Sequence, residues 1–260
     1  MDETILTLTK DKTIADLKQG KRADGRGLED YREITITSEV SKNADGAARV
    51  KLGETEVIAG IKFVPGEPYP DSPDEGTISV SLELLSFASP SFETGPPKPE
   101  AIELGRVVDR GIRESKAIDF KSLCIREGEL VWIVFIDIYV INDDGNMFDA
   151  ASLAAVKALQ NAKMPKLEND KVVHKEHTNK GIDLKRIPVL NTFAKVSDVI
   201  VADPSLRELA ASSARFSVAV TDDGYLSAFQ KGGKGSFMKE EISKCIDIAI
   251  KNSEKLRKKK

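Results

Sequence analysis

Three arginines in the stretch PEAIELGRVVDRGIRES are spaced so that they could bind successive phosphates. Arg106, Arg110 and Arg113 occupy positions i, i+4 and i+7, which places them on one stripe of a helix. The apolar residues of this stretch fall on the opposite face: Leu104, Val108 and Ile112. The residues alone favour a simpler interpretation, in which nearby acids neutralise the arginines as weak surface ion pairs. These acids are Glu103, Asp109 and Glu114.

The stretch VINDDGNMFDAASLAAVKAL predicts a strand that stops at an Asp-Asp-Gly turn and an alanine-rich helix after it. Loops of this kind commonly hold phosphate, because the first amides of the helix are unpaired and point outward. Here the turn is followed by Asn146, Met147 and Phe148, and none of these is an Arg, Lys, Ser or Thr that could help to hold an anion. The loop has the position of a phosphate site without its usual side chains.

Other polar residues give weaker signals. Asp203 ends a predicted strand, with Glu208 five residues later, and a lone aspartate in that place is commonly a cap or turn former. His174 and His177 lie in a polar segment without a third ligand, so we predict no metal site. The segment KGGKG lacks the Lys-Ser/Thr ending of a nucleotide-binding loop and is interpreted as a turn.

The composition bounds the class of protein. With 260 residues, 40% of them hydrophobic, the chain can form one large or two small domains. Its net charge of −3 requires any nucleic-acid contact to come from a local positive cluster. Only two cysteines occur, Cys124 and Cys245, which argues against a disulfide framework. No apolar run approaches the roughly 20 residues needed to cross a bilayer, and the first residues lack a signal-peptide pattern, so we expect a cytoplasmic protein without a membrane partner.

The order of predicted elements indicates an α+β fold with an internal duplication. The first twenty residues predict an amphipathic helix, from Ile5, Leu8, Ile14 and Leu17. Alternating apolar residues from about Tyr31 predict an antiparallel meander, and the run LVWIVFIDIYVI predicts a central strand covered on both faces. A shorter series follows, with strands at VIVADPS, RFSVAVT and YLSAFQ and a closing helix from about Met238 to Lys255. We therefore expect an N-terminal helix and arm (1–30), a first domain (31–165), a linker or hairpin (166–185) and a second domain with a basic tail (186–260).

The order of these pieces resembles the RNase PH family of phosphorolytic 3′-to-5′ exoribonucleases. The pieces are RADGRG, the arginine helix, GELVWIVFIDIYVINDDGN running into a helix, and DPSLRE, and the similarity extends from about Arg22 to the closing helix. The details most resemble the larger, non-catalytic ring subunit of the archaeal exosome core. The resemblance implies two similar βα domains, mixed sheets with helices packed on one side, and a ring with a central channel.

The resemblance also implies that the catalytic residues are missing. Active members carry Gly-Thr-Arg or Gly-Ser-Arg after the Asp-Gly of the loop, where helix amides, a hydroxyl and a guanidinium hold the attacking phosphate. The corresponding loop here is degenerate and consists of Gly145, Asn146, Met147 and Phe148. Active members also place two aspartates six residues apart, for metal binding and acid catalysis; the first matches Asp203 and the second falls on Leu209, which can do neither.

The function that the resemblance implies is a non-catalytic subunit that pairs with an active RNase PH-like chain, three pairs closing a hexameric ring. Arg106, Arg110 and Arg113 would hold single-stranded RNA by its phosphates, which carry no sequence information. Arg22 and Arg26 of RADGRG would lie in the RNA path or at a subunit interface, and RNA-binding cap proteins could dock on the ring. This chain would bind no cofactor, while inorganic phosphate and Mg²⁺ would be used at the partner's site.

Two alternatives stay open at this point. The chain could be an active phosphorolytic exoribonuclease that uses Asp203 and Glu208, if Glu208 replaces the second aspartate. It could also be a scaffold that never touches RNA, with the arginines serving only in interface salt bridges.

Overall fold

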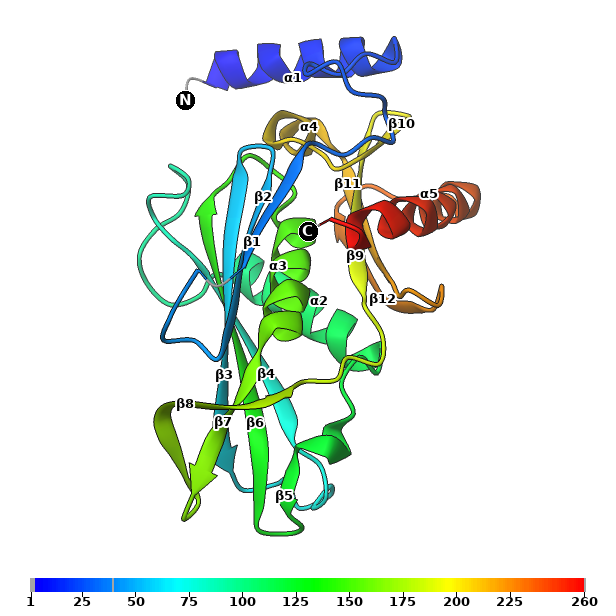
Figure 1. Cartoon of the computed structure of the whole chain (residues 1–260). Helices are drawn as coiled ribbons and strands as arrows, with labels where there is room; N and C mark the ends of the chain where they lie inside the picture. Colours follow the sequence, from blue (N-terminus) through cyan, green and yellow to red (C-terminus); the bar gives the residue numbers. More distant parts are fainter. Residues whose placement is uncertain (1–2, 39, 260) are drawn as a thin grey trace.

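The computed structural model describes residues 3–38 and 40–259, and of residues 3–7, 174 and 175 only the backbone. Its largest sheet has six strands in the order β1-β2-β3-β6-β4, with β5 beside β6 (Figure 1). All neighbours are antiparallel except β4, which runs parallel to β6. The predicted meander is confirmed as the first three of these strands. The strands are β1 (Ile34–Ser38), β2 (Gly46–Leu52), β3 (Thr55–Gly66), β4 (Thr77–Leu84), β5 (Cys124–Arg126) and β6 (Leu130–Asn142).

The central strand β6 differs from its prediction. Its apolar run predicted cover on both faces, but its residues alternate between buried and half-buried. Helices α2 (Pro99–Glu114) and α3 (Met147–Asn161) pack on the same face of the sheet. Val134, Ile136 and Ile138 therefore enter the core, while the intervening residues remain partly exposed. The prediction of helices on one side therefore holds for this sheet.

Helices α2 (Pro99–Glu114) and α3 (Met147–Asn161) lie between the first sheet and a second, four-stranded sheet (Figure 1). The second sheet has the order β10-β9-β11-β12 and is antiparallel throughout. Helix α5 (Lys239–Arg257) covers its other face, where it packs on Phe193, Phe216 and Val218. The second sheet thus has helices on both faces. Its strands are β9 (Val189–Val196), β10 (Val199–Ala202), β11 (Ala214–Val220) and β12 (Leu226–Gly233).

Strand β9 was missed by the sequence analysis, whereas the other three strands of this sheet and the closing helix are confirmed. Its sequence VLNTFAKV breaks the apolar alternation with Asn191 and Thr192. Both residues are nevertheless buried, because their side chains are hydrogen-bonded within the core. A polar pair that signals a surface loop in the sequence belongs here to an internal network.

The remaining elements lie at the periphery. Helix α1 (Glu3–Lys18) packs on the short helix α4 (Leu206–Ala211), with Leu17 buried and Leu8 exposed, while the side chain of Ile5 lies outside the described residues. The polar segment predicted as a hairpin or linker forms the hairpin β7 (Lys163–Glu168) and β8 (Lys171–Gly181), and a 3₁₀ turn, η1 (Phe120–Leu123), precedes β5. In the part of the chain that the structure describes, no helix is long and apolar enough to cross a membrane.

Candidate functional site

Asp203 lies where β10 ends, and its carboxylate is closed off by arginines. Arg32 donates from Nη2 to Oδ1 at 2.8 Å and from Nε to Oδ2 at 2.9 Å, and Arg26 Nη1 lies 2.7 Å from Oδ2. Asn146 Nδ2 adds a hydrogen bond to Oδ1 at 2.8 Å. The side chain of Asp203 is fully buried. Burial by itself would raise the pKa of this carboxyl group, but the hydrogen bonds and charge of Arg32 outweigh it and lower the pKa below its ordinary value.

Glu208 is held in the same way by Arg22. The guanidinium donates from Nε to Oε1 at 2.8 Å and from Nη2 to Oε2 at 2.7 Å, and it also reaches the backbone carbonyls of Ala202 and Asp203. Glu208 additionally accepts the amide of Ser205, whose hydroxyl caps α4 in return. The side chain of Arg22 has no exposed surface. Glu208 is therefore a structural carboxylate of the α4 turn.

The loop between β6 and α3 is in close contact with the residues that begin α4. Gly145 has a positive φ of 89°, and a Cβ there would lie 2.4 Å from the amide nitrogen of Leu206. That amide donates to the carbonyl of Asp144 at 3.1 Å. Met147 and Phe148 are both buried. The two segments that were predicted to be degenerate, the loop and the turn that carries Asp203 and Leu209, thus contact each other. The helix start has apolar side chains where an anion would need donors.

A buried polar network continues from this loop into the second sheet. Asp149 accepts from the hydroxyl of Tyr31 at 2.6 Å, from Asn146 Nδ2 at 2.9 Å, and from the hydroxyl and amide of Thr192 at 2.7 and 3.0 Å. Burial raises the pKa of Asp149 to about 6 although these donors act to lower it. Burial beside Asp149 also raises the pKa of Tyr31. The network joins α3 to β9 and is internal.

Phe148 has a cationic neighbour from the second domain. The guanidinium carbon of Arg215, on β11, lies 3.8 Å from the centre of the Phe148 ring. Arg215 Nη2 is 2.6 Å from Glu103 Oε1 on α2, and Gln230 Nε2 of β12 donates to the same oxygen at 2.8 Å. Arg215 therefore links the degenerate loop to the helix that carries the arginine stripe.

The arginine stripe divides into two kinds of residue. The side chain of Arg113 is 38% exposed and is bound within the chain: it pairs with Asp109 at 3.0 Å, donates to the carbonyl of Ile78 at 3.1 Å, and lies over the Phe120 ring at 5.6 Å. Arg106 and Arg110 are exposed and form no ion pair among the described residues. Of the acids suggested by the sequence, Asp109 pairs with Arg113 and Glu103 pairs with Arg215. Arg106 and Arg110 therefore remain available to a ligand.

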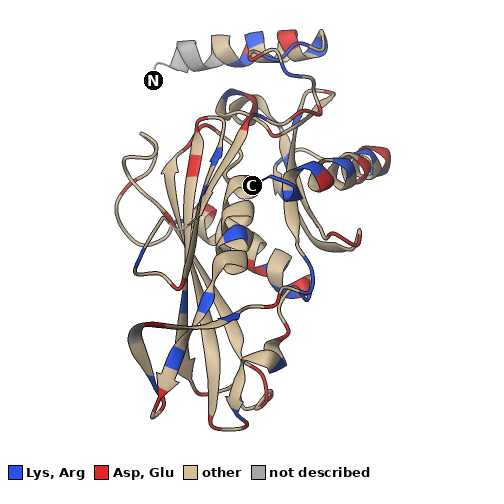
Figure 2. Ribbon diagram, viewed as in Figure 1, with Lys and Arg blue, Asp and Glu red and all other residues tan. Residues whose placement is uncertain are grey.

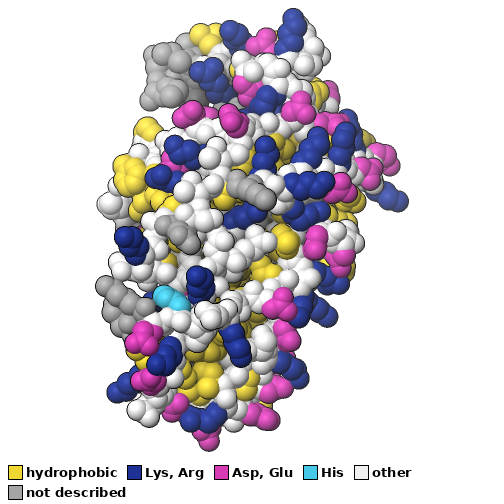
Figure 3. All heavy atoms as spheres, viewed as in Figure 1, with side chains coloured by type: hydrophobic (Ala, Val, Ile, Leu, Met, Phe, Trp, Pro, Cys, Tyr) yellow, Lys and Arg dark blue, Asp and Glu magenta, His cyan; other side chains and the backbone are white. Residues whose placement is uncertain are grey.

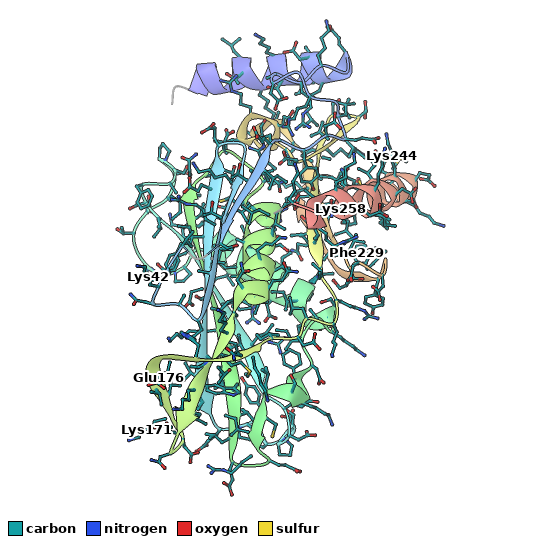
Figure 4. The ribbon with its side chains drawn as sticks, in the orientation of Figure 1. Lys42, Lys171, Glu176, Phe229, Lys244 and Lys258 are labelled. Carbon is teal, nitrogen blue, oxygen red and sulfur yellow. The ribbon has the colours of Figure 1, made fainter. Side chains whose placement is uncertain are left out.

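On the face shown in Figures 2 and 3, the charges of the described residues do not single out another surface. Lys and Arg are interspersed with Asp and Glu along both sheets and α5 (Figure 2). The face shown in Figure 3 carries positive side chains around α5 that alternate with acidic ones. Lys244 of this helix and Lys258, directly after its end, project into solvent (Figure 4).

The structure changes the interpretation of several predicted residues. It brings Arg22, Arg26, Asp203 and Glu208 together, but as ion pairs within one chain. That Arg22 and Arg26 lie in an RNA path or at a subunit interface stays a prediction. In the single chain the side chain of Arg22 has no exposed surface, and that of Arg26 is 12% exposed. Leu209 packs against the apolar cluster that contains Leu17.

Three residues of the site were missed: Arg32, Asp149 and Arg215. Arg32 follows RADGRG closely, and Asp149 directly follows the degenerate loop, so their positions offered some signal; Arg215 offered none, because its partners come from distant segments. No cluster of three or more potential metal ligands occurs within the described residues, and the side chain of His174 lies outside them.

Comparison with known proteins shows the family of the chain. Residues 30–165 match the model of the 3′ exoribonuclease family, domain 1, and residues 186–252 match domain 2 of the same family. The chain belongs to the 3′ exoribonuclease family. It is 44% identical over 260 residues to exosome complex component Rrp42 of Pyrococcus horikoshii, covering 99% of this chain and 95% of that protein. It is 45% identical over 261 residues to the component of the same name from Methanosarcina acetivorans, again covering 99% and 95%.

Two solved structures of archaeal exosomes contain a chain with the same fold. A chain of the Archaeoglobus fulgidus exosome with RNA bound to the active site superposes with a TM-score of 0.93 at 40% identity, covering 98% of both chains. A chain of another archaeal exosome core superposes with a TM-score of 0.88 at 38% identity, covering 98% of this chain and 96% of that one. The predicted resemblance and the predicted fold of two RNase PH-type domains are confirmed.

Proposed function

We propose that this chain is a non-catalytic subunit of an archaeal-type exosome core, which holds single-stranded RNA for the active site of a partner RNase PH-type chain. The ring would contain three such heterodimers, with RNA-binding cap proteins as further partners. The relatives that support the proposal are named as exosome components, and one solved relative is a chain of an exosome with RNA bound to the active site. Since such a complex acts on cellular RNA, the proposal includes a cytoplasmic location.

The observation that carries the non-catalytic assignment is the pairing of Asp203 and Glu208 with arginines. Mg²⁺ requires several oxygen ligands, and a general acid must reach the substrate. Asp203 has no exposed side-chain surface, and Glu208 has 6%. Their oxygens already accept from Arg22, Arg26 and Arg32. These residues therefore do not fit a metal ion, and inorganic phosphate and Mg²⁺ belong in this proposal to the partner's site.

The same observation argues against the alternative of an active enzyme. A shift of the sequence match by one residue would put Glu208 in the second acidic position, but this carboxylate binds Arg22 and the amide of Ser205. Releasing it would uncover a buried guanidinium and an amide of the α4 turn, which is costly.

The RNA contact of the proposal is assigned to Arg106 and Arg110. Both guanidiniums are exposed on α2, whereas Arg113 is engaged by Asp109 and by the carbonyl of Ile78. Arginines of this kind hold RNA through backbone phosphates, which suits degradation regardless of sequence.

The decisive experiment is release of nucleoside diphosphates from single-stranded RNA, with inorganic phosphate and Mg²⁺. The chain alone, the active RNase PH-type chain of the same organism alone, and the mixture are compared. We expect no release by this chain alone, and a lower KM for RNA in the mixture than for the partner alone. Phosphate-dependent release by this chain alone would establish the enzyme alternative. An unchanged KM when Arg106→Gln and Arg110→Gln are introduced into the mixture would establish the scaffold alternative.

A further inference from the structure

The guanidinium of Arg215 is placed by two residues that the sequence analysis treated as unrelated. One is Phe148 of the degenerate loop, whose ring centre lies 3.8 Å from the guanidinium carbon. The other is Gly232 of the KGGKG segment, where a Cβ would lie 2.7 Å from Nη2 and 3.0 Å from Cζ of Arg215. An aromatic ring and a glycine therefore make room for a flat cation. The interpretation of KGGKG as a turn is therefore wrong for Gly232, which lies in β12 opposite Arg215.

The guanidinium of Arg215 attaches α2 to the second sheet. Glu103 accepts from Arg215 Nη2 at 2.6 Å and from Gln230 Nε2 at 2.8 Å, so one carboxylate oxygen ties the helix to both β11 and β12. Further along the helix, Ser227 of β12 donates its hydroxyl to the carbonyl of Gly111 at 3.2 Å. The exposed Arg106 and Arg110 lie between these two points of attachment. Their direction therefore depends on the contacts of the helix with the second domain.

Arg215 does not have the properties of a direct RNA ligand. Its side chain is only 18% exposed, and its charge is paired with Glu103. Its Nε is buried and has no hydrogen-bond partner among the described residues. The position of the guanidinium thus rests on the Phe148 ring, the space at Gly232 and the single carboxylate of Glu103.

We propose that Arg215 is a positioning residue for RNA binding, an inference that rests on the proposed function of α2. Phe148 and Gly232 hold its guanidinium, and the guanidinium holds Glu103, so that Arg106 and Arg110 point toward the RNA. The degenerate loop, which lacks phosphate-binding side chains, thereby has a second role: its Phe148 binds the guanidinium of Arg215 from the other domain.

The test uses the full chain assembled with the active RNase PH-type chain of the same organism. Affinity for a fluorescent oligoadenylate is measured by anisotropy at several salt concentrations, and hydrogen exchange of α2 is measured in the same complexes. The variants are Arg215→Met, which keeps an unbranched apolar side chain beside Phe148, and Gly232→Ala, which keeps the arginine. Gly60→Ala is the matched control, because its Cβ would meet only the Cβ of Ala44, at 3.8 Å.

Arg215→Met and Gly232→Ala are expected to speed hydrogen exchange in α2 and to weaken RNA binding by about 2- to 30-fold. The slope of log affinity against log salt should stay unchanged, because the number of phosphates contacted is the same. A smaller slope with Arg215→Met would show that Arg215 itself binds phosphate, and unchanged exchange or unchanged affinity would also overturn the inference. Gly232→Ala decides the matter if Arg215→Met does not assemble.

A different set of results would show that the proposed function itself is wrong. Replacing Arg106 and Arg110 with Gln should lower both the affinity and the salt slope without changing the exchange of α2. If these replacements leave RNA binding unchanged, α2 is not an RNA-binding helix, and the role of Arg215 in RNA binding is rejected together with it.

Discussion

Arg32 and Asp203 form a two-point ion pair that joins the start of the first domain to the end of β10 in the second. Nη2 of Arg32 lies 2.8 Å from Oδ1 of Asp203, and Nε lies 2.9 Å from Oδ2. The pair is nearly inaccessible to water, with 8% of the arginine side chain and none of the aspartate side chain exposed. A carboxylate that matches a catalytic position of the family thus stabilises the junction of the two domains.

Asp203→Asn should destabilise the chain strongly, because Arg26 and Arg32 lose the buried carboxylate that they share. Their other carboxylate partners, Asp24 and Asp144, are 42% and 44% exposed and compensate less. Breaking a buried pair in this way costs about 3–5 kcal/mol. The free energy of unfolding in urea at pH 7 measures it. Asp170→Asn is the matched control, since Asp170 pairs with Arg126 at 2.7 Å on the surface and its loss should have little effect. If Asp203→Asn and Asp170→Asn lower the free energy of unfolding equally, the buried ion pair of Asp203 does not stabilise the chain.

The stability of the chain should fall between about pH 4 and pH 6 through Asp149. Burial raises the pKa of this carboxyl group from 3.8 to about 6. In that interval the folded state holds a proton that the unfolded state has released, so the free energy of unfolding decreases as pH rises, by about 3 kcal/mol in total. Urea unfolding at several pH values should show a flatter profile for Asp149→Asn. Asp198→Asn, at an exposed position, is the control for the loss of one negative charge. If the unfolding free energy of Asp149→Asn depends on pH in the same way as that of the parent chain, the raised pKa of Asp149 is refuted.

Restoring the family sequence of the loop should not restore phosphorolysis. The double variant Met147→Thr and Phe148→Arg introduces the hydroxyl and guanidinium of active members, yet Leu209 and the paired Asp203 remain. The new guanidinium would also be buried beside Arg215, which lies 3.8 Å from the present ring. We expect no release of nucleoside diphosphates and a lower melting temperature. Phosphate-dependent release by this variant alone would mean that the acidic half of the site is functional.

The arginines of α2 should contribute unequally to RNA binding. Arg106→Gln and Arg110→Gln should each lower the slope of log affinity against log salt by about 0.7, the value for one phosphate contact to single-stranded nucleic acid. Arg113→Gln should mainly lower stability, because Arg113 binds Asp109 and the carbonyl of Ile78. The binding isotherms are measured on the assembled complex. Lys244→Gln on α5 is the control for loss of a surface cation, and a slope change equal to that of Arg110→Gln would show that the binding is nonspecific.

Most of the fold followed from patterns that are local in sequence. Apolar alternation predicted β1 to β3, and the spacing of Leu104, Val108 and Ile112 predicted the buried face of α2, where all three residues lie. Strand β9 was missed because Asn191 and Thr192 look like surface residues until their partners, Ser253 and Asp149, are known. Such partners lie dozens of residues away, so no local pattern announces them.

The sequence by itself determined the type of each chemical group: that residues 146–148 provide no side chain for holding phosphate, that position 209 cannot bind a metal, and that α2 carries three arginines on one stripe. Tertiary structure alone decided which charges remain available. Folding brings Arg22, Arg26 and Arg32 onto Asp203 and Glu208 and brings Arg215 onto Glu103, while Arg106 and Arg110 stay exposed. The physical reason is that a buried charge needs a partner within a few ångströms, and these partners meet only when distant segments of the chain have packed together.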